Sequence, residues 1–385
     1  MRSAQSLLRS PVVLGMAAWL SADTTPALAQ NAGATADTTS LHAKPAQGGS
    51  LIPFPILFYQ PETGTGFGAS VVYLFTLGEG TRPGHEGRSL RSSVGATAIY
   101  TTKKQVITSL DAETFPGGGR YRALANVSFV RFPSSFWGIG NDTPESLEED
   151  YTPDQIAASA EFSVEVARHM YAGVFGQGGN RELRVIEEGG LIATGAVPGT
   201  EDGTLVTLGL ILTRDSRSSN VYPRSGEYHQ LRASRSLDAS GNGNDFSTLS
   251  LDLRTYVPIR SGVMAFRALG IASGETPPFD LMPRLGGESL LRGYFGGRFR
   301  DRSLAALEAE YRSPQWRRLR GVLFAGIGQV ADVPGDMRLD AFHPSAGCGM
   351  RFLLNRREEF SLRVDVGWGF DVESSGVYIG LNQVF

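Results

Sequence analysis

The chain has 385 residues, of which 48 are glycine and 19% are charged, with 36 basic side chains against 39 acidic ones. This balance lacks the basic excess that phosphate backbones attract, and it argues against a nucleic-acid partner. The single cysteine, Cys348, excludes an intramolecular disulfide and gives no support for a cysteine-based metal site.

The N-terminus carries an export signal. Arg2 and Arg9 precede an apolar run over residues 11–20, and Ala27-Leu28-Ala29 forms a cleavage pattern, so residues 1–29 are predicted to be a signal peptide. The apolar run is too short to span a bilayer, and no later run of about eighteen apolar residues could form a transmembrane helix. The exported protein is therefore expected in the periplasm, in the medium or as a membrane barrel.

Residues 30–50 are rich in Ala, Gly, Thr and Ser without periodicity, which predicts a flexible leader. From residue 51 to 385 the apolar residues recur with period two, which predicts an all-β domain. The alternation is clearest in residues 156–166, 249–257 and 362–370, where one face is apolar and the other is charged or glycine.

A soluble antiparallel sandwich also alternates, but three features favour a transmembrane β-barrel. Many strands reach the ten or so residues that cross a bilayer at a tilt, and the polar faces mix both signs of charge, as a wet lumen allows. Aromatic residues end the apolar faces, as girdles at the membrane interfaces would; they are Tyr100, Phe129, Trp368 and Phe385.

The turn signals predict a 16-stranded antiparallel barrel. An even number of strands is required when both chain termini of a barrel lie on the periplasmic side, and links after odd-numbered strands are then extracellular. The predicted strands are 54–60, 63–77, 89–101, 104–114, 120–132, 155–167, 169–185, 204–214, 226–236, 245–257, 261–272, 303–312, 320–331, 345–354, 360–371 and 376–385.

The link after strand 11 contains Gly286-Gly287-Glu288-Ser289-Leu290-Leu291-Arg292-Gly293-Tyr294. Its glycines permit a tight bend, and its Arg-Gly-aromatic tip places a permanent cation where the backbone can press against a wall. Taken alone, this segment would be interpreted as an ordinary surface loop, because glycine is the typical loop residue.

Four motifs in order give the loop a context. They are Pro55 to Gly68 with Tyr59, Glu62, Thr63 and Gly64; Arg214-Asp215 followed by Tyr222-Pro223 and Gly226; Gly286-Gly287 with Leu291-Arg292-Gly293-Tyr294; and Gly380 to Phe385. Together they resemble the BamA/TamA family of outer-membrane assembly and translocation barrels, also called the bacterial surface antigen family.

The resemblance implies an extracellular loop that folds into the lumen, where Arg292 pairs with acidic side chains of the inner wall. Glu310 matches one such acid. The family's second acid is replaced by Gly326, and Asp365 is the expected substitute because it also faces inward. The resemblance further implies that Gly380 and Phe385 belong to a C-terminal signal read by the barrel assembly machinery, although Gln383 stands where an aromatic is frequent.

The family's periplasmic client-binding POTRA domains have no counterpart in the short leader, so a POTRA-less member is expected. The resemblance implies a place in the outer membrane of a Gram-negative bacterium, with lipid and an unfolded outer-membrane or secreted polypeptide as partners. Insertion or translocation would use a weak seam between the first and last strands. Pro53 and Pro55 suggest a short, loosely paired first strand, although they equally fit a simple strand start.

The alternative function is a passive or structural pore lined by Glu161, Glu165, Asp252, Arg254, Glu308 and Arg363. No enzyme activity or cofactor is expected. The nearest match to a G-x-S-x-G elbow, residues 343–347, begins with histidine and precedes a strand, and the five histidines lack metal-binding spacing. The acidic stretch 138–154 is expected to be a solvated loop, because its spacing matches no calcium cage.

Overall fold

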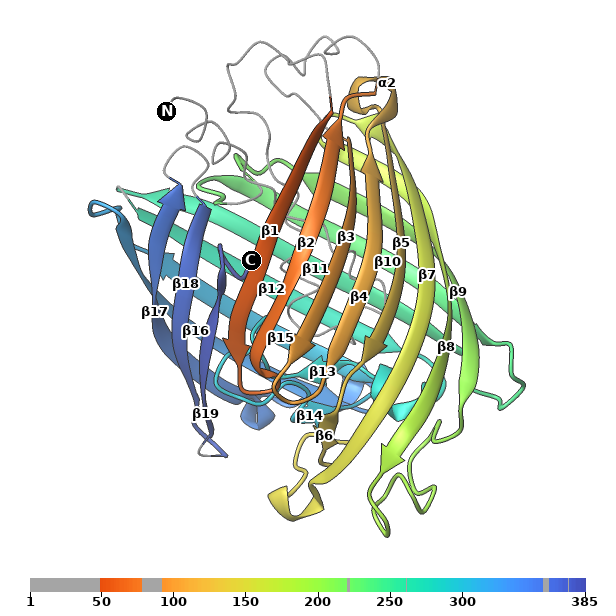
Figure 1. Ribbon diagram of the computed structural model, residues 1–385. Helices are drawn as coiled ribbons and strands as arrows, with labels where there is room; N and C mark the ends of the chain where they lie inside the picture. Colours follow the sequence, from red (N-terminus) through yellow and green to blue (C-terminus); the bar gives the residue numbers. More distant parts are fainter. Residues whose placement is uncertain (1–48, 78–91, 220–221, 261, 356–359, 373) are drawn as a thin grey trace.

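The computed structural model describes residues 49–385 except 78–91, 220–221, 261, 356–359 and 373. The predicted signal peptide, residues 1–29, and all but the last two residues of the leader lie outside the described residues. Within them, long antiparallel strands close into a barrel (Figure 1), which confirms the predicted all-β fold with sixteen wall strands.

Each wall strand pairs with its neighbours in the chain, and the last returns to the first. A three-residue strand, β6 (Ser134–Phe136), adds to the edge of β7. The wall strands are β1 (Ser50–Gln60), β2 (Gly64–Phe75), β3 (Ser92–Thr101), β4 (Val106–Thr114), β5 (Tyr121–Arg131), β7 (Glu149–Ala167), β8 (Met170–Ile186), β9 (Gly203–Asp215), β10 (Gly226–Asp238), β11 (Phe246–Ile259), β12 (Gly262–Ser273), β15 (Ser303–Arg312), β16 (Leu319–Ala331), β17 (His343–Asn355), β18 (Phe360–Gly369) and β19 (Ser374–Leu381).

The alternation predicted from the sequence separates the outside of the barrel from its inside. On β7, Ile156 and Phe162 are exposed on the outer surface, whereas Ser159 and Glu161 are buried. The same division holds on β11, where Leu249 is exposed and Asp252 is buried. Because successive side chains of a strand point to opposite faces, one periodicity decides the surface of the barrel and the lining of its lumen together.

The largest differences from the predicted strand boundaries occur at three places. Strand β1 is longer than expected, because Pro53 and Pro55 lie within a continuous ladder with β2 that runs from Ser50↔Leu74 to Gln60↔Gly64. Strand β7 begins at Glu149 rather than at 155, since the acidic residues at its start pair with β6 and β8.

The third difference is at the C-terminus, where β19 ends at Leu381 instead of continuing to Phe385. Asn382 adopts a left-handed backbone conformation with a φ of 58°. Asparagine tolerates this conformation better than most residues, and it ends the strand.

Closure of the barrel is weak at one place, which we call the seam: the contact between β1 and β19. In the part of the chain that the structure describes, these strands share a single residue pair, Tyr59↔Ile379. By contrast, β18 and β19 pair from Leu362↔Leu381 to Gly369↔Ser374. The seam therefore has far less backbone pairing than the joints beside it.

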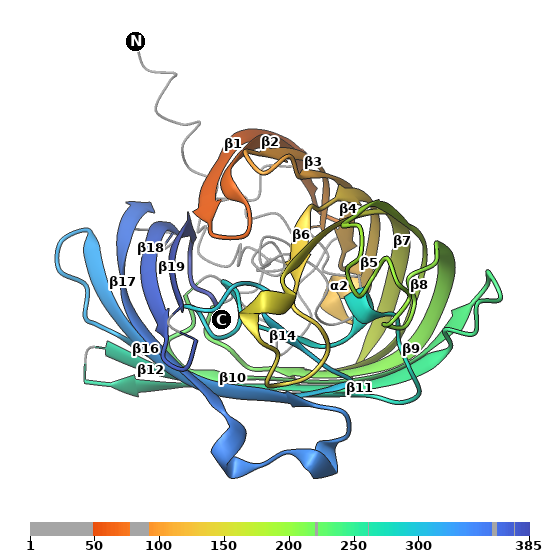
Figure 2. The same ribbon diagram turned by 90° about the horizontal axis from the view of Figure 1, so that it is seen from below.

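The link between β12 and β15, residues 274–302, lies within the ring of strands and is here called the inner loop (Figure 2). It contains a short 3-10 helix, η3 (Phe279–Leu281), and two short strands that pair with each other, β13 (Arg284–Leu285) and β14 (Phe299–Arg300). The short helix α2 (Pro116–Gly119) lies at the opposite end of the barrel. Among the described residues, no helix has the length and apolar character needed to cross a membrane.

Candidate functional site

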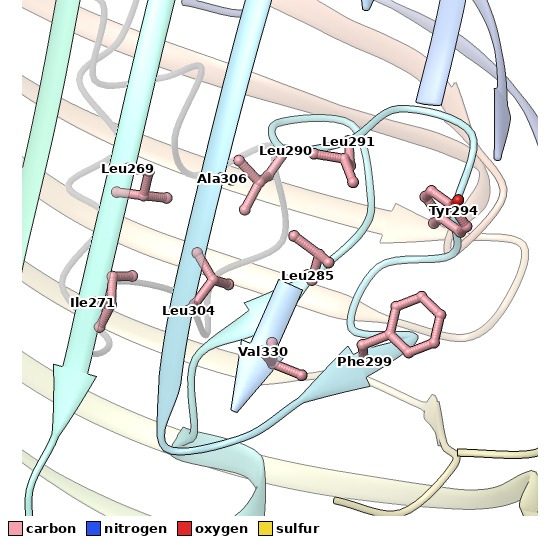
Figure 3. Close-up of a cluster of buried hydrophobic side chains, with 10 residues drawn as sticks. All are labelled: Leu269, Ile271, Leu285, Leu290, Leu291, Tyr294, Phe299, Leu304, Ala306 and Val330. Carbon is pink, nitrogen blue, oxygen red and sulfur yellow. The ribbon is translucent and has the colours of Figure 1, made fainter. Parts of the chain in front are cut away.

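The inner loop is anchored by an apolar cluster against the inner side of the barrel wall (Figure 3). Leu285, Leu290 and Leu291 of the loop pack against wall residues that include Leu304 and Val330. Burying such side chains contributes roughly 1.5–3 kcal/mol each. The loop is thus part of the barrel interior rather than a solvated link.

Arg292 lies at the centre of the polar contacts between loop and wall. Its Nη2 donates to Glu310 at 2.7 Å and its Nη1 donates to Asp365 at 2.6 Å. Its guanidinium also stacks over the ring of Phe324, 3.6 Å from the centroid. The structure therefore brings together three residues that the resemblance singled out, and a planar guanidinium is suited to bridge two carboxylates.

Gly326 lies on β16 at the position where the resemblance places a second acid. A β-carbon at Gly326 would lie 3.1 Å from the Cγ atom of Glu308 and 3.4 Å from a methyl group of Leu291. The glycine leaves room for the apolar part of the loop, and the second carboxylate comes from β18 instead of β16. The departure from the family pattern thus has a steric reason.

Gly293 brings the loop backbone against β18. Its φ of 122° is open mainly to glycine, and a β-carbon there would lie 2.7 Å from the backbone nitrogen of Gly369. The amide of Gly293 donates to the hydroxyl of Tyr378 on β19 at 3.0 Å. The predicted close approach of the Arg-Gly-Tyr tip to a wall therefore occurs on the strands beside the seam.

Tyr294 fixes the same tip at the end of the barrel where β17 begins. Its hydroxyl donates to the carbonyl of Pro344 at 2.7 Å and also contacts the Oδ1 atom of Asp371. The Oδ2 atom of Asp371 contacts the Nδ1 atom of His343. These hydrogen bonds hold the pKa of Asp371 below its ordinary value against the opposing effect of burial, which is the largest single influence. Gly286 and Gly287, with φ of 107° and 100°, form the bend that brings the tip back.

On the β1 side, the loop contacts the β1–β2 hairpin through Glu62. The Oε1 atom of Glu62 accepts the backbone N–H of Gly296 at 2.6 Å, while its Oε2 atom has no hydrogen-bond partner among the described residues. Burial raises the pKa of Glu62 above its ordinary value, although the hydrogen bond from Gly296 opposes this. A cavity of about 80 Å³ lies beside it, lined by the hairpin, β5, β7 and the loop.

The carboxylates that hold Arg292 belong to a wider network of buried arginines. Arg312 donates to Glu310 at 2.9 Å, and Arg351 contacts Asp365 while donating to Gln383 at 3.1 Å. Mutual pairing of this kind is what makes buried charges tolerable. The unexpected Gln383 of the C-terminal tail therefore has a partner inside the lumen.

Phe385 does not join an aromatic girdle on the outer surface, and this prediction is wrong. Its side chain is 5% exposed and packs with Tyr222, Tyr256 and Val263, and its carbonyl accepts from Arg312. The turn at Asn382 carries the tail into the lumen, where an apolar ring is buried more fully than at an interface. Gly380, the other residue of the implied assembly signal, remains in β19.

The residues proposed to line a pore lie on the inner face, and several of them are engaged with other lumen side chains or with the loop. Asp252 bonds Arg254 and Arg267 at 2.6 and 3.0 Å, and Glu308 accepts the amide of Leu291 at 3.1 Å. Glu161 is buried, Glu165 is half-buried, and Arg363 pairs with Glu288. The lumen wall is therefore covered by the loop over part of its area.

The acidic stretch 138–154 is only partly a loop. Glu145 and Glu148 are exposed in and directly after a short 3-10 helix, η2 (Glu145–Leu147), whereas Asp154 lies in β7 and pairs with Arg131 at 2.6 Å. Among the described residues, no group of three or more His, Cys, Asp or Glu side chains is arranged to hold a metal ion.

Sequence reasoning missed three contributors, Glu288, Arg351 and Tyr378. Glu288 lies inside the quoted loop motif, yet a single acid in a polar loop gives no periodic signal. Tyr378 and Arg351 alternate correctly for the inner face of their strands, so the period-two pattern could have marked them as lumen residues but not as partners of the loop.

The model of the Omp85 superfamily domain matches residues 120–385. Among solved structures, the fold is similar to that of BamA from Haemophilus ducreyi lacking POTRA domains 1–3, with a TM-score of 0.62 and 12% identity over 87% of this chain and 70% of that one.

It is also similar to CdiB from Acinetobacter baumannii (TM-score 0.55, 13% identity, 87% of this chain and 59% of that one) and to CdiB from Escherichia coli (0.55, 11%, 86% and 62%). The chain thus spans less than two thirds of the two CdiB chains. A search of curated proteins found no significant match. Because the family model covers more than half of the sequence and the barrel geometry agrees with it, the chain belongs to the Omp85 superfamily.

Proposed function

We propose that this protein is an outer-membrane barrel of a Gram-negative bacterium that assists the insertion or translocation of other polypeptides at its seam. The observation that carries the proposal is the single pair Tyr59↔Ile379 between β1 and β19, beside a β1–β2 ladder that runs the full length of β1. An incompletely paired strand is a template for another strand. Membership of the Omp85 superfamily supports the proposal.

Site-specific photo-crosslinking in cells tests the proposal. Probes replace Leu57 on β1 and Val377 on β19, which are exposed on the outer surface beside the seam. A matched control probe replaces Leu110 on β4, which is equally exposed but distant from the seam in the sheet order.

Adducts with unfolded outer-membrane or secreted polypeptides at Leu57 and Val377, absent at Leu110, are the expected result. Adducts of equal intensity at all three positions, or only adducts between β1 and β19, would contradict the proposal. The second result would favour the alternative of a passive pore with a closed wall.

A further inference from the structure

We propose that the inner loop is a clasp across the seam, and that the carboxylate of Glu288 closes it by holding β1 and β18–β19 at the same time. The clasp is a property of the barrel without any client. Its use in insertion or translocation rests on the proposed function.

Glu288 lies directly inside the single backbone pair of the seam. Gln60 follows Tyr59 on β1, and its Nε2 donates to the Oε2 atom of Glu288. Gly380 follows Ile379 on β19, and a β-carbon there would lie 3.1 Å from the Oε1 atom of Glu288. The two oxygens of the carboxylate therefore face opposite sides of the seam, since Oε2 contacts β1 and Oε1 lies beside β19.

Arg363 completes the contact on the far side. This β18 residue forms an ion pair with the Oε1 atom of Glu288, and both side chains are buried. A β-carbon at Gly380 would also lie 3.0 Å from Arg363, so the glycine leaves the space in which acid and base meet. A residue of the implied C-terminal signal thus has a second role, which is to admit the clasp.

Two further contacts tie neighbouring parts of the loop to opposite sides of the seam. Gly296 donates its amide to Glu62 of the β1–β2 hairpin, at 2.6 Å. Gly293 donates its amide to Tyr378 of β19, at 3.0 Å. The segment from Glu288 to Gly296 therefore crosses from one edge strand to the other.

Whether strand pairing or the loop holds the seam closed depends on the free energy that each kind of contact contributes. A single pair of backbone hydrogen bonds makes a modest net contribution, whereas hydrogen bonds to buried charges are stronger and their loss leaves an unpaired charge. Closure therefore depends more on the loop than on strand pairing. The seam opens when Glu288 leaves Gln60 or the loop moves as a unit.

Thiol exchange across the seam measures its closure. In a Cys348→Ser background, Tyr59→Cys and Ile379→Cys form a directly opposed pair, and opposed residues of antiparallel strands lie within disulfide range. The purified protein is placed in phospholipid vesicles without client, in a glutathione redox buffer. The equilibrium fraction of disulfide then gives the effective concentration of the two thiols.

Glu288→Ala is expected to lower this effective concentration about fivefold or more, since it removes hydrogen bonds to a buried charge. Gln60→Leu cuts only the β1 side and is expected to act in the same direction. The control Glu113→Gln disturbs an ion pair with Arg122 between β4 and β5, and leaves the seam thiols unchanged. A second control pair, Leu57→Cys with Phe67→Cys in the β1–β2 ladder, is unaffected by any of these changes.

The clasp is refuted if Gln60→Leu and Glu288→Ala both fold, as judged by heat-modified gel mobility, and keep the parent's effective concentration. Should Glu288→Ala fail to fold, Gln60→Leu alone decides, because it leaves the Glu288–Arg363 pair in place. Altered thiol exchange without client adducts at Leu57 would keep the clasp and reject the proposed function. The reverse result would keep the function and reject the clasp.

Discussion

At the scale of single residues, Arg292 ties its loop to three strands of the barrel wall. It joins Glu310 of β15 to Asp365 of β18 and stacks on Phe324 of β16. Phe295, three residues later, is half-buried and packs against Trp137 with ring centroids 5.2 Å apart. The two side chains therefore differ in kind, since one neutralises buried acids and the other covers apolar surface.

Arg292→Ala is expected to destabilise the barrel by about 3 kcal/mol, at the low end for a broken buried ion pair, because Arg312 and Arg351 still face the two acids. Arg292→Lys restores only part of this, since an ammonium cannot serve both carboxylates in one plane. Phe295→Ala serves as the control and costs less, roughly 1 kcal/mol. The temperature at which gel mobility changes on heating, supported by urea unfolding, ranks the variants; equal values for Arg292→Ala and Phe295→Ala would refute the role of Arg292.

At the scale of elements, β1 has two unlike edges. Gln60↔Gly64 closes the β1–β2 hairpin, and Gly64 has a φ of 60°. The carbonyl of Thr65, the next residue of β2, accepts the backbone N–H of Thr102 at 2.9 Å, so Thr65 faces β3 rather than β1. This parity directs the even-numbered residues of β1 towards β2 and the odd-numbered ones towards the seam.

The odd positions include Pro53 and Pro55, which explains why the prolines do not interrupt the β1–β2 ladder. A proline lacks the N–H group, so it is tolerated where the missing donor would face an edge. On the seam edge, the same prolines remove two of the donors that β19 or another strand could use. The expectation that β1 is poor in pairing capacity therefore holds for one edge of the strand, while its predicted shortness is wrong.

Amide hydrogen exchange, followed by NMR in detergent micelles, tests this division of β1. The amides of Phe54, Ile56 and Phe58 are expected to exchange slowly because they bond to β2, whereas the amide of Leu57 exchanges faster because it faces the seam. A ratio of about ten between Leu57 and its neighbours corresponds to about 1.4 kcal/mol of protection. Exchange at Leu57 as slow as at Ile56 would mean that the seam is paired along β1.

At the scale of the whole molecule, the inner loop and the C-terminal tail each occupy part of the lumen. The apolar cluster around Leu291 occupies it near β12, β15 and β16, and the C-terminal tail occupies it near Tyr222 and Tyr256. Loop and tail are connected through the wall, because Glu310 accepts both Arg292 and Arg312, and Arg312 also contacts the carbonyl of Phe385. An unobstructed channel is not compatible with this arrangement.

Single-channel recording in planar bilayers is therefore expected to show small, irregular openings. A variant in which a short glycine-serine link replaces residues 287–295 removes the tip and gives larger, steadier currents, provided that its gel mobility still changes on heating. Phe295→Ala is the control, since it leaves the Arg292 contacts in place. Large and steady conductance of the unaltered protein would support the passive pore instead.

The sequence by itself determined the wall of this barrel. Period-two alternation is a local property. The outward position of Phe162 and the inward position of Glu161 can therefore be predicted from the neighbouring residues of the same strand. Turn residues mark where each strand ends, and sixteen strands follow from counting them. The inner-face position of Glu310 follows from the same alternation, whereas the motif around Arg292 was singled out by its resemblance to the family.

The tertiary structure alone decided which inner residues meet. Arg351 donates to Gln383, Phe385 turns into the lumen at Asn382, and Glu288 of the inner loop contacts Gln60 of β1. These contacts join residues up to 228 positions apart, and they depend on how an aperiodic loop folds inside a closed ring. No local pattern encodes that path, because the partners become neighbours only after the barrel closes around the loop.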